Sequence, residues 1–139
     1  MKNLAIIVLL FLLISCSDND NDPNTILPNV PVNETIFLIN PEFIDLIHPG
    51  NWAYTNGGIS GIIIYNSLGN YVAFERAAPH LTPQNCSIME VEAPFMMCAC
   101  DQSIFSILDG SPLTNGINYA AKQYRVEVLG NNTLRITNF

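Results

Sequence analysis

The sequence predicts an all-β domain, and three features point to that class. Short runs of β-branched and aromatic residues recur along the chain, and they are separated by Pro, Gly and Asn, as strands are separated by turns. The run at 122–128 alternates apolar and polar residues, which is typical of an antiparallel strand with one face in water. Gly130, Asn131 and Asn132 follow it and favour a hairpin into the last strand.

One short helix is expected among the candidate strands. Asn40 and Pro41 favour a helix over residues 41–47, with Asn40 as N-cap and Pro41 in the first helical position. Apolar residues make up 49% of the full chain, and residues 26–139 are enough for one compact domain but not for two. The expected strands are 35–39, 52–55, 61–65, 71–75, 87–91, 103–107, 122–128 and 133–136.

The first fifteen residues have the features of an export signal. Lys2 supplies a positive charge, and residues 4–14 form an apolar run of 11 residues, whereas a membrane-spanning helix needs roughly 20. The run ends in Ser15-Cys16, which resembles a bacterial lipobox. This resemblance implies that residues 1–15 are a lipoprotein signal peptide and that Cys16 carries lipid. The alternative is an uncleaved N-terminal helix with an incidental cysteine.

Residues 16–27 are expected to form a lipidated acidic tether, and residues 28–139 the folded domain. Residues 17–24 contain three carboxylates, a proline and no apolar residue, a composition that cannot offset the entropy lost on ordering. Acidic residues directly after the cysteine resemble the signal that sends lipoproteins of Bacteroidetes-like bacteria to the outer face of the outer membrane. An ordinary hydrophilic linker is the alternative. We therefore expect an outer membrane lipoprotein of the cell envelope, facing either the periplasm or the surface.

Charge and motif content exclude several classes of function. The formal net charge is −7, and only four basic residues lie beyond the signal peptide, so a nucleic-acid partner is not expected. No later segment is long and apolar enough to span a bilayer, and the membrane partner is therefore expected to be reached through the lipid alone. The sequence has no nucleophile elbow, zinc-protease motif or phosphate-binding glycine loop, which argues against an enzyme.

One constellation points to a known family. Ala78-Pro79-His80 is followed, after 17 residues, by the run from Cys98 to Ser103. This arrangement resembles the two cluster-binding loops of a Rieske iron-sulfur domain, which carry C-x-H and C-x-x-H and supply two cysteines and two histidines to a 2Fe–2S cluster. Asp109-Gly110 and the strand around Tyr124 match later features of the family. The resemblance implies a Rieske-like antiparallel β sandwich or barrel with the two loops at one end.

The departures from the family pattern concern the cluster ligands. His80 and Cys98 stand at two of the four ligand positions, whereas Ala78 and Asp101 stand at the other two. Ser103 keeps the hydroxyl that, in the family, hydrogen-bonds a cluster sulfur. Because each iron would lose one ligand, we expect vestigial loops without a cofactor and a binding or structural role. A 2Fe–2S electron-transfer protein with non-standard ligands is the alternative.

The family resemblance also bears on the remaining cysteines. High-potential Rieske domains join their loops by a disulfide whose second-loop member corresponds to Cys100, and Cys86 is the candidate partner in this chain. An oxidising compartment would preserve such a bond. Pairing of Cys86 with Cys98 is the competing possibility, whereas a Cys98–Cys100 ring would be strained. The choice between the first two stays open on the sequence.

A mononuclear zinc or copper module is the second alternative function. His80 and Cys98 would be its central metal ligands, and Cys86 and Asp101 would complete a mixed set of imidazole, thiolate and carboxylate. The spacing matches no standard zinc motif. A single loop histidine is more often a hydrogen-bonded structural residue than a metal ligand.

Overall fold

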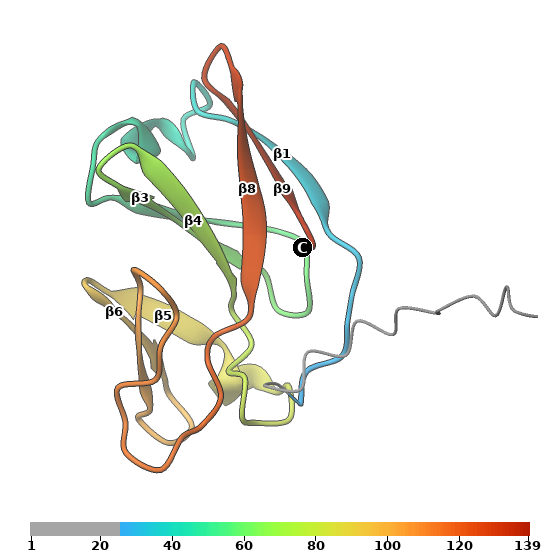
Figure 1. The fold of residues 1–139 in the computed structure, drawn as a ribbon, viewed down its shortest axis with the longest axis vertical. Helices are drawn as coiled ribbons and strands as arrows, with labels where there is room; N and C mark the ends of the chain where they lie inside the picture. The colour runs from blue at the N-terminus through green and yellow to red at the C-terminus, as the bar shows by residue number, and fades with distance from the viewer. Residues whose placement is uncertain (1–25) are drawn as a thin grey trace, which may run out of the picture.

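The computed structural model describes residues 26–139, and it consists of two antiparallel sheets. The larger sheet has six strands in the order β1-β9-β8-β4-β3-β2, and the smaller one has the order β5-β6-β7. In Figure 1 the smaller sheet lies below the larger one. The strands are β1 Asn33–Phe37, β2 Trp52–Thr55, β3 Ile62–Ser67, β4 Asn70–Glu75, β5 Met89–Glu92, β6 Phe95–Cys98, β7 Ile104–Ser106, β8 Gln123–Gly130 and β9 Thr133–Thr137. The all-β prediction is confirmed.

Cys16, the predicted signal peptide at 1–15 and most of the predicted tether lie outside the described residues. Among residues 26–139, no helix is both long and apolar enough to cross a membrane. The predictions of lipidation, export and location therefore stay predictions.

The first half of strand β3 is buried on both faces, and this explains its run of three isoleucines. Successive side chains of a strand point to opposite sides of the sheet. Ile62 and Ile64 pack in one core, together with side chains of β1 and β9. Ile63 points to the other side and packs in a second core with Phe74 of β4. The second core also contains residues of the smaller sheet, among them Met96 and Phe105. The six-stranded sheet thus separates two hydrophobic cores.

Two local predictions need correction. The expected helix at 41–47 is a 3-10 turn at Ile44–Ile47, and the side chain of Asn40 does not cap it. Within residues 41–47 only Phe43 and Leu46 are buried, so the buried face is too short to favour a longer helix. The central strand of the smaller sheet, β6, was not predicted, because its methionines do not carry the β-branched signal of a strand.

The hairpin predicted after residue 128 is present. Asn131 and Asn132 both have positive φ angles, of 50° and 56°, as the two central residues of a type I′ turn require. Strands β8 and β9 pair on either side of them. Local turn chemistry was therefore sufficient to place this connection.

The N-terminal segment reaches the domain beside the first of the two loops. The Ile26 amide donates a hydrogen bond to the Pro79 carbonyl at 3.3 Å. The Lys122 ammonium donates to the carbonyl of Pro28, and Asn138 bonds to Val30 and Val32. In Figure 1 the blue segment runs from this point up to β1. Ile26 therefore lies at the loop end of the domain.

Candidate functional site

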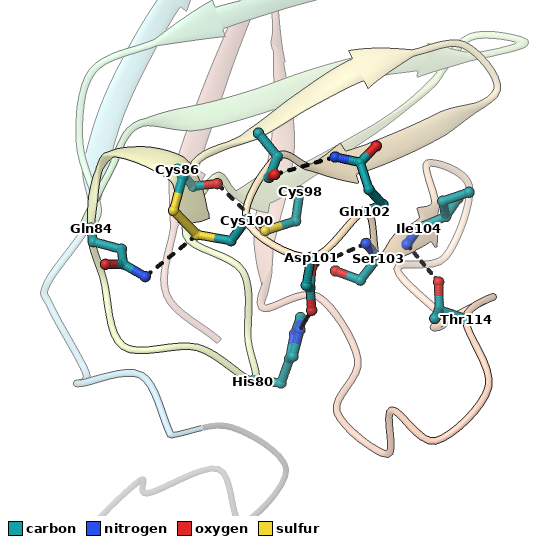
Figure 2. Close-up of polar contacts among 11 residues, drawn as sticks. His80, Gln84, Cys86, Cys98, Cys100, Asp101, Gln102, Ser103, Ile104 and Thr114 are labelled. Carbon is teal, nitrogen blue, oxygen red and sulfur yellow. Dashed lines mark hydrogen bonds and ion pairs between the residues drawn. A yellow bond between two sulfur atoms is a disulfide. The ribbon is translucent and has the colours of Figure 1, made fainter.

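Two loops converge at one end of the domain, as Figure 2 shows. The first loop, residues 77–88, joins β4 to β5, and its two ends are held together by a bridge between Ala77 and Ile88. The second loop, residues 99–103, joins β6 to β7. Because β6 is the centre of the small sheet, the second loop is presented from a rigid hairpin. The predicted placement of both loops at one end of the fold is confirmed.

A disulfide joins the two loops. Cys86 of the first loop is bonded to Cys100 of the second, with their Cα atoms 4.8 Å apart. The Cys100 amide also donates to the Cys86 carbonyl at 3.0 Å, so the backbones meet at the same point. The structure thus contains the Cys86–Cys100 pairing and not the competing pairing of Cys86 with Cys98.

Cys98 remains a buried free thiol. Its sulfur lies 3.6 Å from the Cys86 carbonyl oxygen, to which the thiol donates. Burial raises the pKa of Cys98, and the charge of Asp101 adds to this effect. Cys98 is therefore held as a neutral thiol beside the disulfide and is a poor nucleophile.

An imidazole–carboxylate pair forms a second link between the loops. Nε2 of His80 lies 2.7 Å from Oδ2 of Asp101, and the other carboxylate oxygen accepts the Ser103 amide at 3.0 Å. Partial burial by itself would raise the pKa of Asp101, but the hydrogen bonds from His80 and Ser103 outweigh it and hold this pKa well below its usual range. The carboxylate is therefore ionised at neutral pH. It fixes the His80 ring, whose side chain is 12% exposed.

Two buried polar atoms at this end lack a hydrogen-bond partner among the described residues: His80 Nδ1 and Ser103 Oγ. The Ser103 hydroxyl lies close enough to Asp101 to help lower the pKa of that carboxyl, yet it forms no well-aligned hydrogen bond. They belong to two of the side chains for which the family resemblance implied contact with a cluster. Their orphaned atoms are the one feature here that fits a bound group.

The other donors do not fit a 2Fe–2S cluster. Ala78 is fully buried and has no donor atom, while Asp101 is engaged with His80 and with the Ser103 amide. The Cys98 thiol is neutral and bonded to a backbone carbonyl. The structure therefore brings His80, Cys98, Asp101 and Ser103 together as predicted, but with their polar groups largely directed at the protein itself.

The predicted mononuclear metal set must be corrected. Cys86 cannot supply a thiolate to His80, Cys98 and Asp101, because its sulfur is in the disulfide. Within residues 26–139, no group of three or more His, Cys, Asp and Glu side chains is arranged to hold a metal ion.

Gln102 adopts a backbone conformation that favours glycine. Its φ is 62°, in the left-handed region that favours glycine, and its amide donates to the Cys98 carbonyl at 3.0 Å. The second loop therefore turns tightly at Gln102 although this residue carries a side chain.

Sequence reasoning missed Glu75, the charged residue at the centre of a buried network. Its carboxylate is fully buried and accepts the amides of Ile59, Ser60 and Ala77 at 2.7, 2.9 and 2.9 Å. The Tyr124 hydroxyl donates to it as well, at 2.8 Å, and burial next to this carboxylate raises the pKa of Tyr124. An acidic residue at the end of the apolar run 71–74 was the available signal.

The two sheets and the paired loops define a Rieske-like β domain. No family model matches the sequence, and no curated protein matches it. Among solved structures, the ferredoxin of carbazole 1,9a-dioxygenase from Nocardioides aromaticivorans IC177 is similar, with a TM-score of 0.50 and 14% identity over 80% of this chain and 100% of that chain. A protein described as the small subunit of an NADH-dependent nitrite reductase from Mycobacterium tuberculosis also matches, with a TM-score of 0.50 and 15% identity over 80% and 98%. At these identities the similarity establishes the fold alone.

Proposed function

We propose that this protein is an exported lipoprotein of the outer membrane whose Rieske-like domain works without a cluster, as a binding or structural module. The observation that carries the proposal is the use of the potential ligands for contacts between the loops. His80 bonds to Asp101, and Cys86 bonds to Cys100. Both links join the first loop to the second, so the loop end is held together without iron.

A disulfide is suited to this task in an exported protein. It persists outside the reducing cytoplasm, and it closes a loop with a sequence separation of 14 residues. The buried neutral thiol of Cys98 adds no nucleophile that would exchange with it readily. These features support a structural loop end and no catalytic residue is assigned to it.

The attachment of the N-terminal segment supports a position close to a membrane. Ile26 follows Cys16 by ten positions, so a lipid on Cys16 would hold the point where Ile26 bonds to Pro79 within about 35 Å of the bilayer. A single acyl chain anchors only marginally, whereas the multiple chains of a bacterial lipoprotein anchor firmly.

The first test is to express the full chain in a bacterial host and to measure three quantities. We expect an incorporated fatty-acid label that is lost in Cys16→Ala, no stoichiometric iron or acid-labile sulfide, and an intact Cys86–Cys100 bond by peptide mapping. About two irons and two sulfides per chain would overturn the cluster-free proposal. Absence of label would overturn the anchoring, independently of the metal result.

A second candidate function is electron transfer through a 2Fe–2S cluster with non-standard ligands. The orphaned His80 Nδ1 and Ser103 Oγ favour it, since both atoms would find a partner in a bound cluster. The same metal analysis separates the two functions, and visible absorption by the purified protein would favour this second one.

A further inference from the structure

A hollow of about 510 Å³ opens beside the connection between β2 and β3, outside the two loops described above. Its size falls in the range of small-molecule sites, roughly 300–1,000 Å³. Residues 55–61 form one side, and Glu42, Phe43, Tyr54 and Arg76 also line it.

The wall formed by residues 55–61 is held in place by Glu75 and Arg76. The buried carboxylate of Glu75 accepts the amides of Ile59 and Ser60. Gly58 lies so close to this network that an added Cβ would come within 2.2 Å of a Glu75 carboxylate oxygen. The Arg76 amide donates to the Gly61 carbonyl at 2.9 Å and fixes the end of the connection. A wall held in this way loses little freedom when a ligand binds.

Arg76 is held in place while part of its guanidinium group stays unpaired. The guanidinium carbon lies 4.1 Å from the centre of the Tyr54 ring, and Nε donates to the Met89 carbonyl at 3.2 Å. Within residues 26–139, the two terminal nitrogens of Arg76 have neither a hydrogen bond nor an ion pair. An arginine lining a hollow and fixed at Nε and by ring stacking is prepared to bind an anion.

We propose that this hollow binds a free α-amino acid, with the carboxylate on the terminal nitrogens of Arg76. The planar guanidinium matches a carboxylate in a two-bond arrangement. Glu42 lines the same hollow and is not paired with Arg76 in the described structure, so it supplies the opposite charge for an ammonium group. A ligand that carries both charges satisfies both side chains, whereas a simple carboxylate satisfies only Arg76.

The test uses the full chain in detergent micelles and follows the Nε–H signal of Arg76 by NMR during titration. Glycine is the probe, and sodium acetate, methylammonium chloride and sodium chloride are compared at equal ionic strength. We expect glycine to shift the Arg76 signal in a saturable way, acetate to bind several-fold more weakly, and the two chlorides to give no saturable shift.

Variants assign the contacts. Arg76→Lys keeps the charge but loses the planar group, and we expect it to weaken glycine binding by about tenfold or more. The matched control is Arg125→Lys, because Arg125 also lies over an aromatic ring, Phe139, at 5.7 Å but outside the hollow; it should bind glycine normally. Glu42 is exposed, so Glu42→Gln should leave the fold intact and weaken glycine binding while leaving acetate binding unchanged.

Several results would overturn the proposal. They are the absence of a saturable glycine shift, equal binding of acetate and glycine, and unchanged glycine binding in Glu42→Gln or in folded Arg76→Lys. If Arg76→Lys does not fold, the unmodified chain and Glu42→Gln still decide the question. None of these results depends on lipid or metal content, so the proposal can fail while the proposed function stands, and the reverse.

Discussion

Nε2 of His80 lies 2.7 Å from Oδ2 of Asp101, and this pair links the two loops at one end of the domain. The disulfide between Cys86 and Cys100 links the same loops at a second point. Two links made by protein side chains therefore join the loops.

The disulfide should contribute substantially to stability. Replacing both cysteines, in Cys86→Ser/Cys100→Ser, should lower the free energy of unfolding by about 3 kcal/mol, the effect expected for closing a loop of this length. Urea unfolding checks it. Dithiothreitol should lower the stability of the unmodified protein by a similar amount and leave the double variant unchanged. Equal stability of the two proteins without reductant would contradict the structural role.

The Cys98 thiol should be unreactive in the folded protein. It is fully buried and its pKa is raised, so little thiolate forms and a reagent cannot reach it. With Cys16→Ala removing the upstream cysteine, a thiol reagent should react slowly in buffer and modify one thiol per chain in urea. The same protein with Cys98→Ala added should show no modified thiol in urea. Rapid modification of native Cys98 would contradict its placement.

The Asp101 link should weaken in acid. Because the pKa of Asp101 is lower in the folded chain than in the unfolded chain, where it is about 3.9, its contribution is complete above that pH and is lost as the pH falls further. Asp101→Asn should therefore be less stable than the unmodified protein at pH 6, and the gap should narrow below about pH 4. The free energy of unfolding, measured between pH 2.5 and pH 7, checks this prediction, because the two values bracket the pKa of about 3.9 in the unfolded chain. In a His80→Gln background the gap should be smaller throughout, and a gap independent of pH would contradict the pairing.

The Tyr124 hydroxyl should contribute more to the stability of the fold than the Tyr71 hydroxyl. Tyr124→Phe removes a buried hydrogen bond to the charged Glu75, which typically costs about 1.5–3 kcal/mol. Tyr71→Phe is the matched control, since it removes a hydrogen bond of 3.2 Å to the neutral Leu46 carbonyl and should cost about 0.5–1.5 kcal/mol. Chemical unfolding of both variants gives the comparison. Equal losses of stability in the two variants would show that the hydrogen bond to Glu75 contributes no more than the one to the Leu46 carbonyl.

A side chain at position 58 should destabilise the fold. Gly58→Ala places a Cβ 2.2 Å from Glu75 Oε2 and 2.7 Å from the Tyr124 hydroxyl oxygen. Gly116→Ala is the control, because Gly116 also has a positive φ but no atom lies within 4 Å of an added Cβ. We expect Gly58→Ala to be less stable than Gly116→Ala by about 1–3 kcal/mol. Thermal unfolding measures the difference, and equal stability would contradict the close packing.

Much of the fold was predictable because its signals are local. The Asn131-Asn132 turn requires positive φ angles that asparagine tolerates, and alternation over 122–128 placed the last hairpin. Strand β6 was missed, because its methionines carry no strand preference and its position was decided by pairing with β5 and β7 on either side. The helix predicted at 41–47 was also wrong: the structure has a 3-10 turn at Ile44–Ile47, without the side-chain cap that was expected from Asn40.

The sequence by itself determined the all-β class, the final hairpin and the order of the two loops, since these follow from alternation, turn residues and spacing along the chain. Only the tertiary structure decided that Cys86 pairs with Cys100, because two thiols bond when the fold brings their Cα atoms close, here to 4.8 Å. The tertiary structure also decided that Asp101 pairs with His80. It likewise decided that Glu75 accepts hydrogen bonds from the connection between β2 and β3, beside Arg76. Those contacts join residues distant in sequence, and no local pattern specifies which partner a buried donor finds.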